Sequence, residues 1–206
     1  MVFAQTSRPL SLSTASTQRS KRFIHQEIYD ICLKAQLESI EALAPGKKLS
    51  DIQNDCFKTI LTGLRDLGIV KGDVETLFQK GIHGYFMPHS IGHYIGFKTH
   101  DVGFQRQPPK EEEPKPDAPP AQPLTKDQLK MYEPVTRDVL QANVVTTIEP
   151  GIYFIEILKE KAKSKEELAE FFDFDKYEEY MEVGGVRIED DILVTETGYD
   201  MLTEVR

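Results

Sequence analysis

The sequence predicts an α+β protein, because amphipathic helical patterns fill its first part and β-branched strand patterns fill its last part. Apolar residues recur at helical spacing between Gln26 and Leu43 and again after Ser50, whereas the run Val144–Ile148 is entirely β-branched. Helices followed by antiparallel-type strands indicate layers of helix and sheet within one fold.

Residues 1–22 differ from the rest of the chain. No Asp or Glu occurs before Glu27, while Arg8 and Arg19 stand among many Ser and Thr residues. We expect an atypical basic segment without stable structure here, and a folded domain over residues 23–206. An acid-free, Ser- and Arg-rich start also fits a mitochondrial transit peptide, a disordered tail or an artefact of the gene model.

Three helices are expected before the first strand. The first covers Gln26 to Leu43 and ends at Pro45-Gly46. The second starts at a capping-box pattern of Ser50 and Gln53. Its apolar stripe consists of Ile52, Cys56, Ile60 and Leu64. A shorter helix is expected over Val74 to Lys80.

A proline-rich stretch at residues 105–125 interrupts the pattern. It holds seven of the twelve prolines and the triplet Glu111-Glu112-Glu113, so it is expected to form an exposed loop. The loop is interpreted as a variable insertion, or alternatively as a lid over a site.

The last part of the chain predicts strands. Val144–Ile148 is broken by Glu149-Pro150-Gly151 and resumes at Ile152, because proline cannot donate to a ladder. A helix is expected from Ser164 to about Met181. A strand is expected from Gly184 to Val194, with a final strand near Met201.

Composition excludes some classes of partner. The 206 residues carry a net charge of −9, so nucleic acid and acidic membranes are poor partners. No run of 18 apolar residues exists, and no membrane span is expected. Cys32 and Cys56 lie in helical patterns and are expected to be buried thiols in a reducing, cytoplasmic compartment.

Four of the five histidines fall between His83 and His100, the other two being His89 and His93. A single histidine is usually filler, but this density favours a metal or proton-transfer site. Carboxylates must supply the remaining ligands, because neither a His-Glu-x-x-His motif nor a cysteine pair is present.

Two acids are candidate partners for these histidines. Glu149 stands between a buried-looking strand and Pro-Gly, where an unpaired acid is costly. Glu189 lies in a strand, where alternation places it on the face of Arg187 and Asp191, so a structural ion pair is the alternative to a metal ligand. Oxygen ligands with imidazole favour Mn²⁺, Fe²⁺, Co²⁺ or Zn²⁺.

Three motifs in this order and spacing resemble the pita-bread metallopeptidase family, which includes methionine aminopeptidase, aminopeptidase P and prolidase. They are His89-Ser-Ile-Gly-His93 with His100-Asp-Val-Gly, Thr147-Ile-Glu149-Pro-Gly, and Gly185-Val-Arg187-Ile-Glu189-Asp-Asp. The likeness is strongest to eukaryotic prolidase (Xaa-Pro dipeptidase) and aminopeptidase P, and it implies the C-terminal part of a catalytic domain.

The resemblance implies a role for each matching position. His93, Glu149 and Glu189 are implied as metal ligands, with Glu149 also exchanging a proton with the attacking water. His89 and His100 are implied to contact the substrate or the tetrahedral intermediate. Arg187 is implied to orient the carboxylates, and Arg137 is the candidate to bind the proline carboxylate.

The resemblance also implies a substrate and a cofactor. The substrate class is Xaa-Pro dipeptides or short peptides, the cofactor is a divalent metal with Mn²⁺ favoured over Zn²⁺ or Co²⁺, and the assembly is a homodimer. The family supplies two further Asp ligands upstream of the first helix, and no acid occurs there in this sequence. We therefore expect a partial fold that lacks those strands and the N-terminal domain. We also expect at most one metal ion instead of two, and impaired hydrolysis. The alternative function is a non-catalytic peptide- or protein-binding module.

Overall fold

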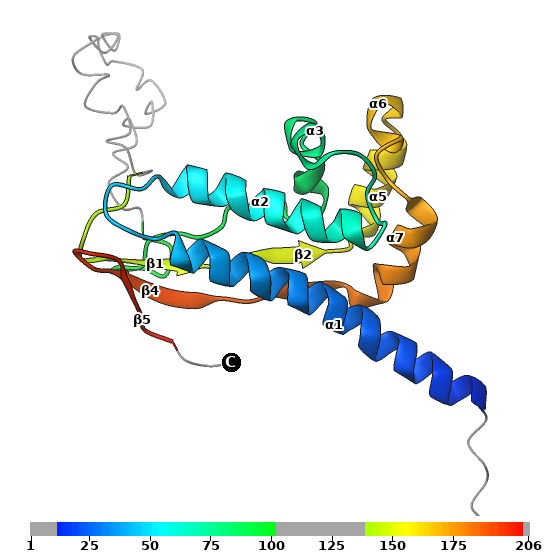
Figure 1. Cartoon of the computed structure of the whole chain (residues 1–206), viewed down its shortest axis with the longest axis horizontal. Coiled ribbons are helices and arrows are strands. Elements are labelled where there is room, and N and C mark those ends of the chain that lie inside the picture. The colour runs from blue at the N-terminus through cyan, green and yellow to red at the C-terminus, as the bar shows by residue number, and fades with distance from the viewer. Residues whose placement is uncertain (1–11, 102–138, 204–206) are drawn as a thin grey trace, which may run out of the picture. The chain divides into compact units, whose positions relative to one another are not determined.

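The computed structural model in Figure 1 describes the backbone of residues 12–101 and 139–203, and the side chains of these ranges from Phe23 onward. The chain divides into two compact units. Of the described residues, the first unit takes 12–36, 57–89 and 150–188, and the second takes 37–56, 90–101, 139–149 and 189–203. Each unit is therefore assembled from segments that are far apart in the sequence.

Two long helices each contribute to both units. Helix α1 spans Leu12–Glu41 and helix α2 spans Leu49–Asp66. We expected the first helix to begin at Gln26, but it begins at Leu12, because no Gly or Pro between Pro9 and Pro45 interrupts it. Helix α1 thus includes residues 12–22 of the basic N-terminal segment, and the expected boundary at residue 22 stays a prediction.

The apolar stripe expected in α2 is confirmed. All four members are nearly or completely inaccessible to solvent, namely Ile52, Cys56, Ile60 and Leu64. Gly68 follows the helix with φ of +76°, a backbone conformation that favours glycine. The expected capping box is wrong in one respect, since the Gln53 side chain instead accepts a hydrogen bond from the Ile91 N–H at 3.0 Å.

In the first unit, short helices surround a small two-stranded sheet. The helices are α3 (Val74–Gln79), η1 (Ile82–Tyr85), α5 (Glu156–Lys163), α6 (Glu166–Ala169), α7 (Phe174–Tyr180) and η2 (Met181–Val183). Strand β2 (Gly151–Tyr153) pairs antiparallel with β3 (Gly185–Arg187). The core is aromatic: Phe86, Phe154 and Tyr177 contact one another edge-on or tilted.

The single helix expected from Ser164 to Met181 was wrong. Ser164 is the C-cap of α5, and the chain turns again before α7, where Asp173 caps the new helix by accepting from the Lys176 N–H at 3.0 Å. Leu168 and Phe172 are both buried, but residues four apart also share one face of a continuous helix, so helical periodicity does not reveal these breaks.

The second unit contains a three-stranded antiparallel sheet in the order β1-β4-β5, formed by Val144–Ile148, Asp190–Val194 and Tyr199–Met201. The expected strand from Gly184 to Val194 is therefore two strands, β3 and β4, which belong to different sheets. Strand β1 pairs with β4, and β2 pairs with β3. The chain therefore leaves one sheet for the other at Glu149-Pro150, between β1 and β2, and at Ile188-Glu189, between β3 and β4.

The core of the second unit combines strand residues with the end of α1 and the start of α2. Its buried apolar members include Ile40, Leu43, Ile52, Ile91, Leu140, Ile148, Ile192 and Val194. Cys32 and Cys56 are both buried thiols outside a disulfide, as expected. None of the helices in the described ranges combines the length and the hydropathy that a bilayer span requires. The expected loop at 105–125 and Arg137 lie outside the described residues.

Candidate metal centre

The second unit places the segment 91–95 alongside β1 as an additional edge. Three main-chain hydrogen bonds join them, from Glu149 N–H to Ile91 O (2.7 Å), from Thr147 N–H to His93 O (2.9 Å) and from Ile95 N–H to Val145 O (3.0 Å). Gly92 permits this approach, because a Cβ built on it would stand 2.0 Å from the carbonyl oxygen of Thr147.

The register of segment 91–95, β1 and β4 brings the candidate ligands to one face of the sheet. Tyr94 pairs with Thr146, so His93 stands beside Thr147 and shares its face. Glu149 lies two residues further along and therefore points the same way. On the other side of β1, Ile148 pairs with Asp190, so the next step of the register sets Glu149 opposite Glu189.

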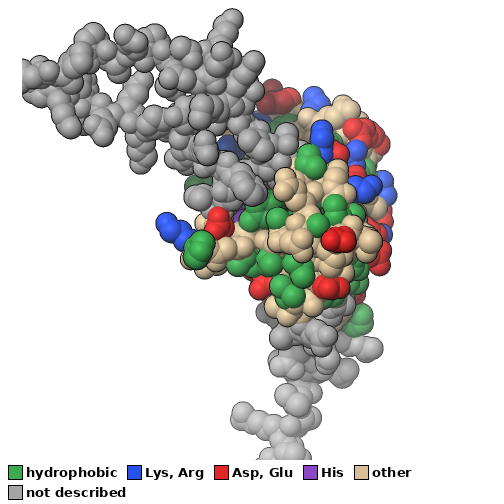
Figure 2. Space-filling model, turned by 90° about the vertical axis from the view of Figure 1, so that its left-hand side faces the viewer, with side chains coloured by type: hydrophobic (Ala, Val, Ile, Leu, Met, Phe, Trp, Pro, Cys, Tyr) green, Lys and Arg blue, Asp and Glu red, His purple; other side chains and the backbone are tan. Residues whose placement is uncertain are grey.

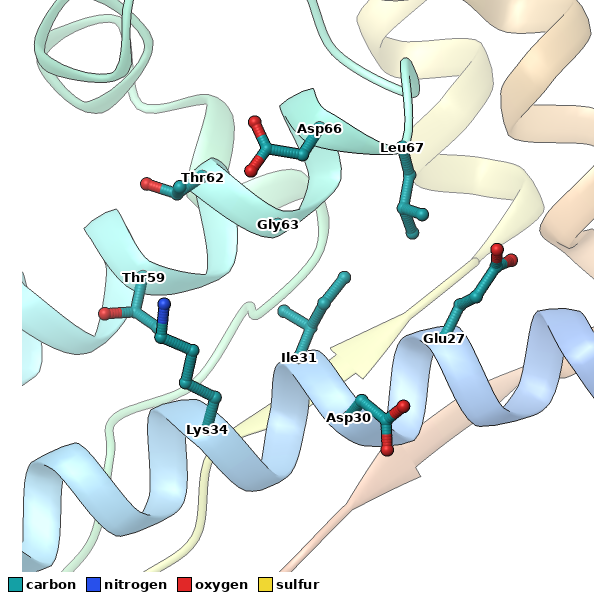
Figure 3. A pocket seen from close by; sticks show the side chains of 9 residues that line it. All are labelled: Glu27, Asp30, Ile31, Lys34, Thr59, Thr62, Gly63, Asp66 and Leu67. Carbon is teal, nitrogen blue, oxygen red and sulfur yellow. The ribbon is translucent and has the colours of Figure 1, made fainter.

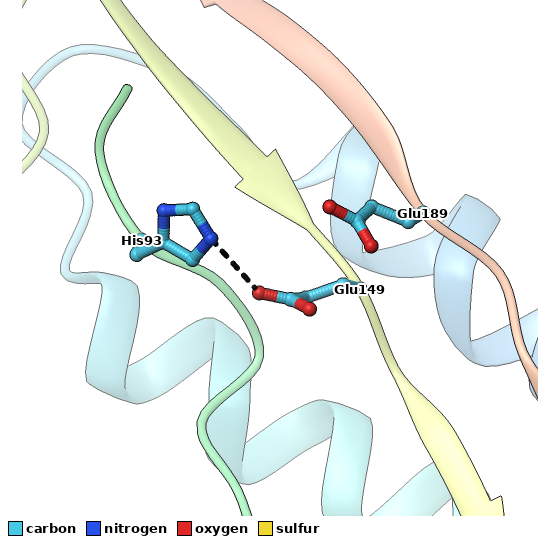
Figure 4. Close-up of side chains that lie close together, drawn as sticks. All are labelled: His93, Glu149 and Glu189. Atoms are coloured by element: carbon cyan, nitrogen blue, oxygen red, sulfur yellow. Dashed lines mark ion pairs between the residues drawn. The ribbon is translucent and has the colours of Figure 1, made fainter. Parts of the chain in front are cut away.

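The side chains of His93, Glu149 and Glu189 converge, as Figure 4 shows. One ligand atom from each lies within 4.8 Å of the other two, and His93 Nε2 is 3.4 Å from Glu149 Oε1. Glu149 is buried, with 7% of its surface exposed, while Glu189 is exposed. Within the described ranges, this is the group of His, Cys, Asp and Glu side chains with the spacing of a metal site.

The donor set fits a divalent metal. His93 Nδ1 lies 3.1 Å from the carbonyl oxygen of Tyr94, an acceptor, so the neutral ring carries its proton on Nδ1 and directs the Nε2 lone pair toward Glu149. Two ligands bound tetrahedrally at about 2.0–2.2 Å stand roughly 3.3–3.6 Å apart. The separation of 3.4 Å between Nε2 and Oε1 matches this range.

Thr147 is a member of the site that the sequence analysis did not single out. Its hydroxyl lies 3.0 Å from the His93 backbone nitrogen and 3.3 Å from Glu149 Oε1, and the residue is 2% exposed. The available signal was its position two residues before Glu149, which in a strand means a shared face.

His100 lies beside the cluster in the same unit. Its ring centroid is 4.2 Å from that of His93. The turn that carries it is closed by Asp101, whose Oδ2 accepts from the Phe97 N–H at 3.0 Å. The structure thus places His100 against one candidate ligand, and its role toward a substrate stays a prediction.

In the first unit, His89 and Arg187 share a partner that the sequence analysis missed. The Tyr153 hydroxyl accepts from Arg187 Nε at 2.8 Å and lies 3.2 Å from His89 Nε2. A Cβ on Gly151 or on Gly185 would stand 2.5 Å from the Tyr153 side chain, so both glycines make room for this ring. The expected role of Arg187 in orienting carboxylates stays a prediction.

His83 belongs to the core of the first unit. Its ring stacks on Phe57 and Phe78 with centroid distances of 4.2 and 5.2 Å. Burial lowers the pKa of this imidazole below its ordinary value. Of the four clustered histidines, this one is therefore a packing residue.

A groove between α1 and α2 in the first unit has a volume of about 330 Å³ (Figure 3). Ile31 and Leu67 line it together with acidic residues. Two of these acids already have partners: Glu27 accepts from the Tyr180 hydroxyl at 2.8 Å, and Asp66 pairs with Arg65 at 2.9 Å. No sequence-predicted site residue lines the groove.

On the face of the molecule shown in Figure 2, acidic and basic side chains are interspersed with hydrophobic ones among the described residues. The expectation that polyanions are poor partners, which rests on the net charge of −9, stays a prediction.

Comparison with known proteins extends over most of the chain. Two curated relatives are each named "Probable Xaa-Pro aminopeptidase". The one from Ajellomyces capsulatus is 36% identical over 179 residues, which make up 86% of this chain and 34% of the relative. The one from Talaromyces stipitatus is 39% identical over 178 residues, which make up 86% and 35%.

Solved structures give the same picture. A variant of Escherichia coli aminopeptidase P in complex with substrate matches with a TM-score of 0.60 and 28% identity, over 87% of this chain and 31% of that chain. Proline aminopeptidase P II from Yersinia pestis matches with a TM-score of 0.60 and 27% identity, over the same shares. These matches confirm the expected α+β class and pita-bread architecture.

The chain spans about a third of the length of the relatives it matches, 34% and 35% of the two fungal proteins and 31% of the bacterial structures. The model of one protein family, described as metallopeptidase family M24, matches residues 4–196. On this evidence, and with a His–Glu–Glu cluster of metal-site geometry in its second unit, the chain belongs to metallopeptidase family M24.

Proposed function

We propose that His93, Glu149 and Glu189 hold a divalent metal ion that serves the hydrolysis of peptide bonds preceding proline. The observation that carries this proposal is the convergence of the three ligand atoms within 4.8 Å, from three segments distant in sequence. Membership of a metallopeptidase family supports it, as does the alignment of the Nε2 lone pair of His93 with Glu149.

The proposed ion is Mn²⁺, with Zn²⁺ and Co²⁺ as alternatives, because two carboxylates and one imidazole form a predominantly hard ligand set. We propose one ion per chain. Three protein ligands leave open coordination positions for water and substrate, as in mononuclear hydrolytic sites. Within the described residues, the side chains close enough to share an ion in groups of three or more form this one cluster.

Each residue of the proposed site has its own role in hydrolysis. The metal supplies Lewis acidity toward the attacking water and the scissile carbonyl. Glu149 is buried beside the other candidate ligands, where it would take up the proton of the attacking water and return it to the leaving imino nitrogen. Charge-assisted hydrogen bonds from His89 and His100 stabilise the oxygen of the tetrahedral intermediate.

Arginines provide the remaining proposed contacts. Arg187 donates from its Nε to the Tyr153 hydroxyl, and its guanidinium group is the proposed partner that orients carboxylates of the site. Arg137 is the proposed partner of the substrate's proline carboxylate; it lies outside the described residues.

The proposed substrates are short peptides with proline in the second position. The names of the relatives, Xaa-Pro aminopeptidases, favour peptides longer than two residues, whereas the likeness of the Gly151–Phe154 run to prolidase favours dipeptides. We also propose a homodimer, as in prolidases, and a reducing compartment, which is supported by two buried thiols that form no disulfide.

Hydrolysis by this chain alone is proposed to be slow. The resemblance implies two further Asp ligands before the first helix, and the residues given before Glu27 include no acid, so a second ion is not part of the proposal. The same observation favours the second candidate function, a peptide-binding module that retains the fold without hydrolysis.

The deciding experiment measures proline release from Gly-Pro and amino-acid release from an Xaa-Pro-Xaa tripeptide, with Mn²⁺ present. Slow Mn²⁺-dependent release that disappears in Glu149→Gln supports the peptidase. Binding of either peptide without turnover supports the binding module. Release that Glu149→Gln leaves unchanged contradicts the proposed site.

A further inference from the structure

We propose that Thr147 is a positioning residue of the candidate metal centre, whose hydroxyl joins the His93 backbone to the Glu149 carboxylate. The inference rests on the proposed metal centre, and it assigns a function to a side chain that is not itself a ligand. Thr147 is 2% exposed, so its hydroxyl must find its partners within the protein.

The first half of the link replaces an ordinary strand hydrogen bond. Two directly opposed residues of an antiparallel ladder exchange two main-chain bonds. Thr147 N–H donates to His93 O at 2.9 Å, but the return bond from His93 N–H runs to Thr147 Oγ1, at 3.0 Å. The side chain has therefore taken the place of the carbonyl, which holds the His93 backbone next to β1.

The second half follows from counting protons. The Thr147 hydroxyl has one proton, with two acceptors in range, His93 O at 3.4 Å and Glu149 Oε1 at 3.3 Å. His93 O already accepts the Thr147 N–H and lies 3.1 Å from Thr146 Oγ1. A carbonyl has two lone pairs, and a charged acceptor binds a hydroxyl more strongly, so the proton goes to Glu149.

Two consecutive hydrogen bonds through the Thr147 hydroxyl therefore connect the candidate ligands His93 and Glu149. Glu149 Oε1 is the same oxygen that lies 3.4 Å from His93 Nε2. Thr147 therefore restricts the carboxylate to the conformation that faces the imidazole, before any metal is bound. Such preorganisation is the established function of residues behind a metal's ligands, and their loss costs about 10- to 100-fold in metal affinity.

Three variants of the full chain test this. Thr147→Val keeps the shape and removes the hydroxyl, Thr147→Ser keeps the hydroxyl, and Thr147→Ala controls for a steric effect of valine. The matched control is Thr62→Val, since the Thr62 hydroxyl bonds to Lys58 O within α2 at 2.8 Å and lies outside the candidate metal centre. Circular dichroism establishes that each variant is folded.

With Mn²⁺ as the probe, calorimetry is expected to show binding weakened about 10- to 100-fold in Thr147→Val and Thr147→Ala. Binding in Thr147→Ser and Thr62→Val should stay close to that of the wild type. Equal affinity of the wild type and folded Thr147→Val would overturn the inference.

A second arm needs no metal. Hydrogen exchange followed by NMR should show that the His93 amide loses protection in Thr147→Val and keeps it in Thr147→Ser, because only serine restores the acceptor. If the wild type binds no Mn²⁺, the proposed metal centre is refuted. The positioning role is overturned separately, by His93 protection that does not change in Thr147→Val.

Discussion

Glu149 stands opposite Glu189 at the end of the β1–β4 ladder, one step beyond the last pair, Ile148 and Asp190. Pro150 follows Glu149 directly and has no N–H to continue the ladder. Two carboxylates are thus left facing each other where the strands part, a repulsive arrangement that a bound cation would relieve. The His93 imidazole completes the group from the other side of β1.

Gly92 is predicted to be essential for the site. In Gly92→Ala the new Cβ would stand 2.0 Å from a backbone oxygen, so the segment 91–95 must move away from β1. We expect a loss of about 1–3 kcal/mol in the free energy of unfolding, together with weaker Mn²⁺ binding. Urea denaturation and calorimetry measure the two effects.

The control for this substitution is Gly84→Ala, since a Cβ at Gly84 meets nothing within 4 Å. It should leave Mn²⁺ binding unchanged. If both variants bind Mn²⁺ as the wild type does, the close approach at Gly92 does not position the site.

Cys32 is predicted to resist alkylation in the folded chain. Burial raises the pKa of its thiol to about 11, and Sγ donates to the carbonyl oxygen of Pro150 at 3.2 Å. At pH 8 only about one thiol in a thousand is then the reactive thiolate. Mass spectrometry after iodoacetamide treatment should find Cys32 unmodified in the native chain and modified in urea; equal labelling in both would contradict its buried position.

His83 is predicted to make stability depend on pH. Burial lowers its folded-state pKa, so the unfolded chain binds its proton at a higher pH than the folded chain does. The free energy of unfolding is therefore unaffected by His83 above the unfolded-state pKa of about 6.5, and it falls as the pH drops below that pKa. In His83→Phe this part of the loss should disappear, because phenylalanine fills the stack between Phe57 and Phe78 without titrating.

Thermal unfolding between pH 5 and pH 8 measures this dependence. The exposed His25 supplies the control, since His25→Gln should keep the wild-type loss on acidification. A His83→Phe variant that loses as much stability as the wild type at pH 5 would show that this imidazole is not responsible.

Hydrophobic periodicity in the sequence predicted the helices and strands that continue regularly over several helical turns or strand residues. The stripe of α2 and the strand Val144–Ile148 were predictable because helical and β-branched patterns repeat several times within each. The separation of β3 from β4 was not, because Ile188 continues the apolar alternation through the break. Only the pairing with β1 and β2 shows that the strand changes sheet there.

The sequence predicted the site residues whose side chains can bind a metal and which lie in recognisable motifs. His93, Glu149 and Glu189 were identified by residue type and by resemblance, and the structure brings them together. Thr147 and Tyr153 were missed because their importance lies in what they bond to, across 54 residues from His93 and 34 from Arg187. Single-sequence patterns contain no information on such contacts.

The most direct test of the central claim is the number of Mn²⁺ ions that the chain retains at equilibrium dialysis, compared among the wild type, Glu149→Gln and Glu189→Gln. Asp200→Asn is the control, since it removes one carboxylate from an exposed position in the same unit. The account predicts one weakly held ion in the wild type and in Asp200→Asn, and none in the two glutamate variants. Two tightly held ions in the wild type, or an ion that persists in both glutamate variants, would contradict it.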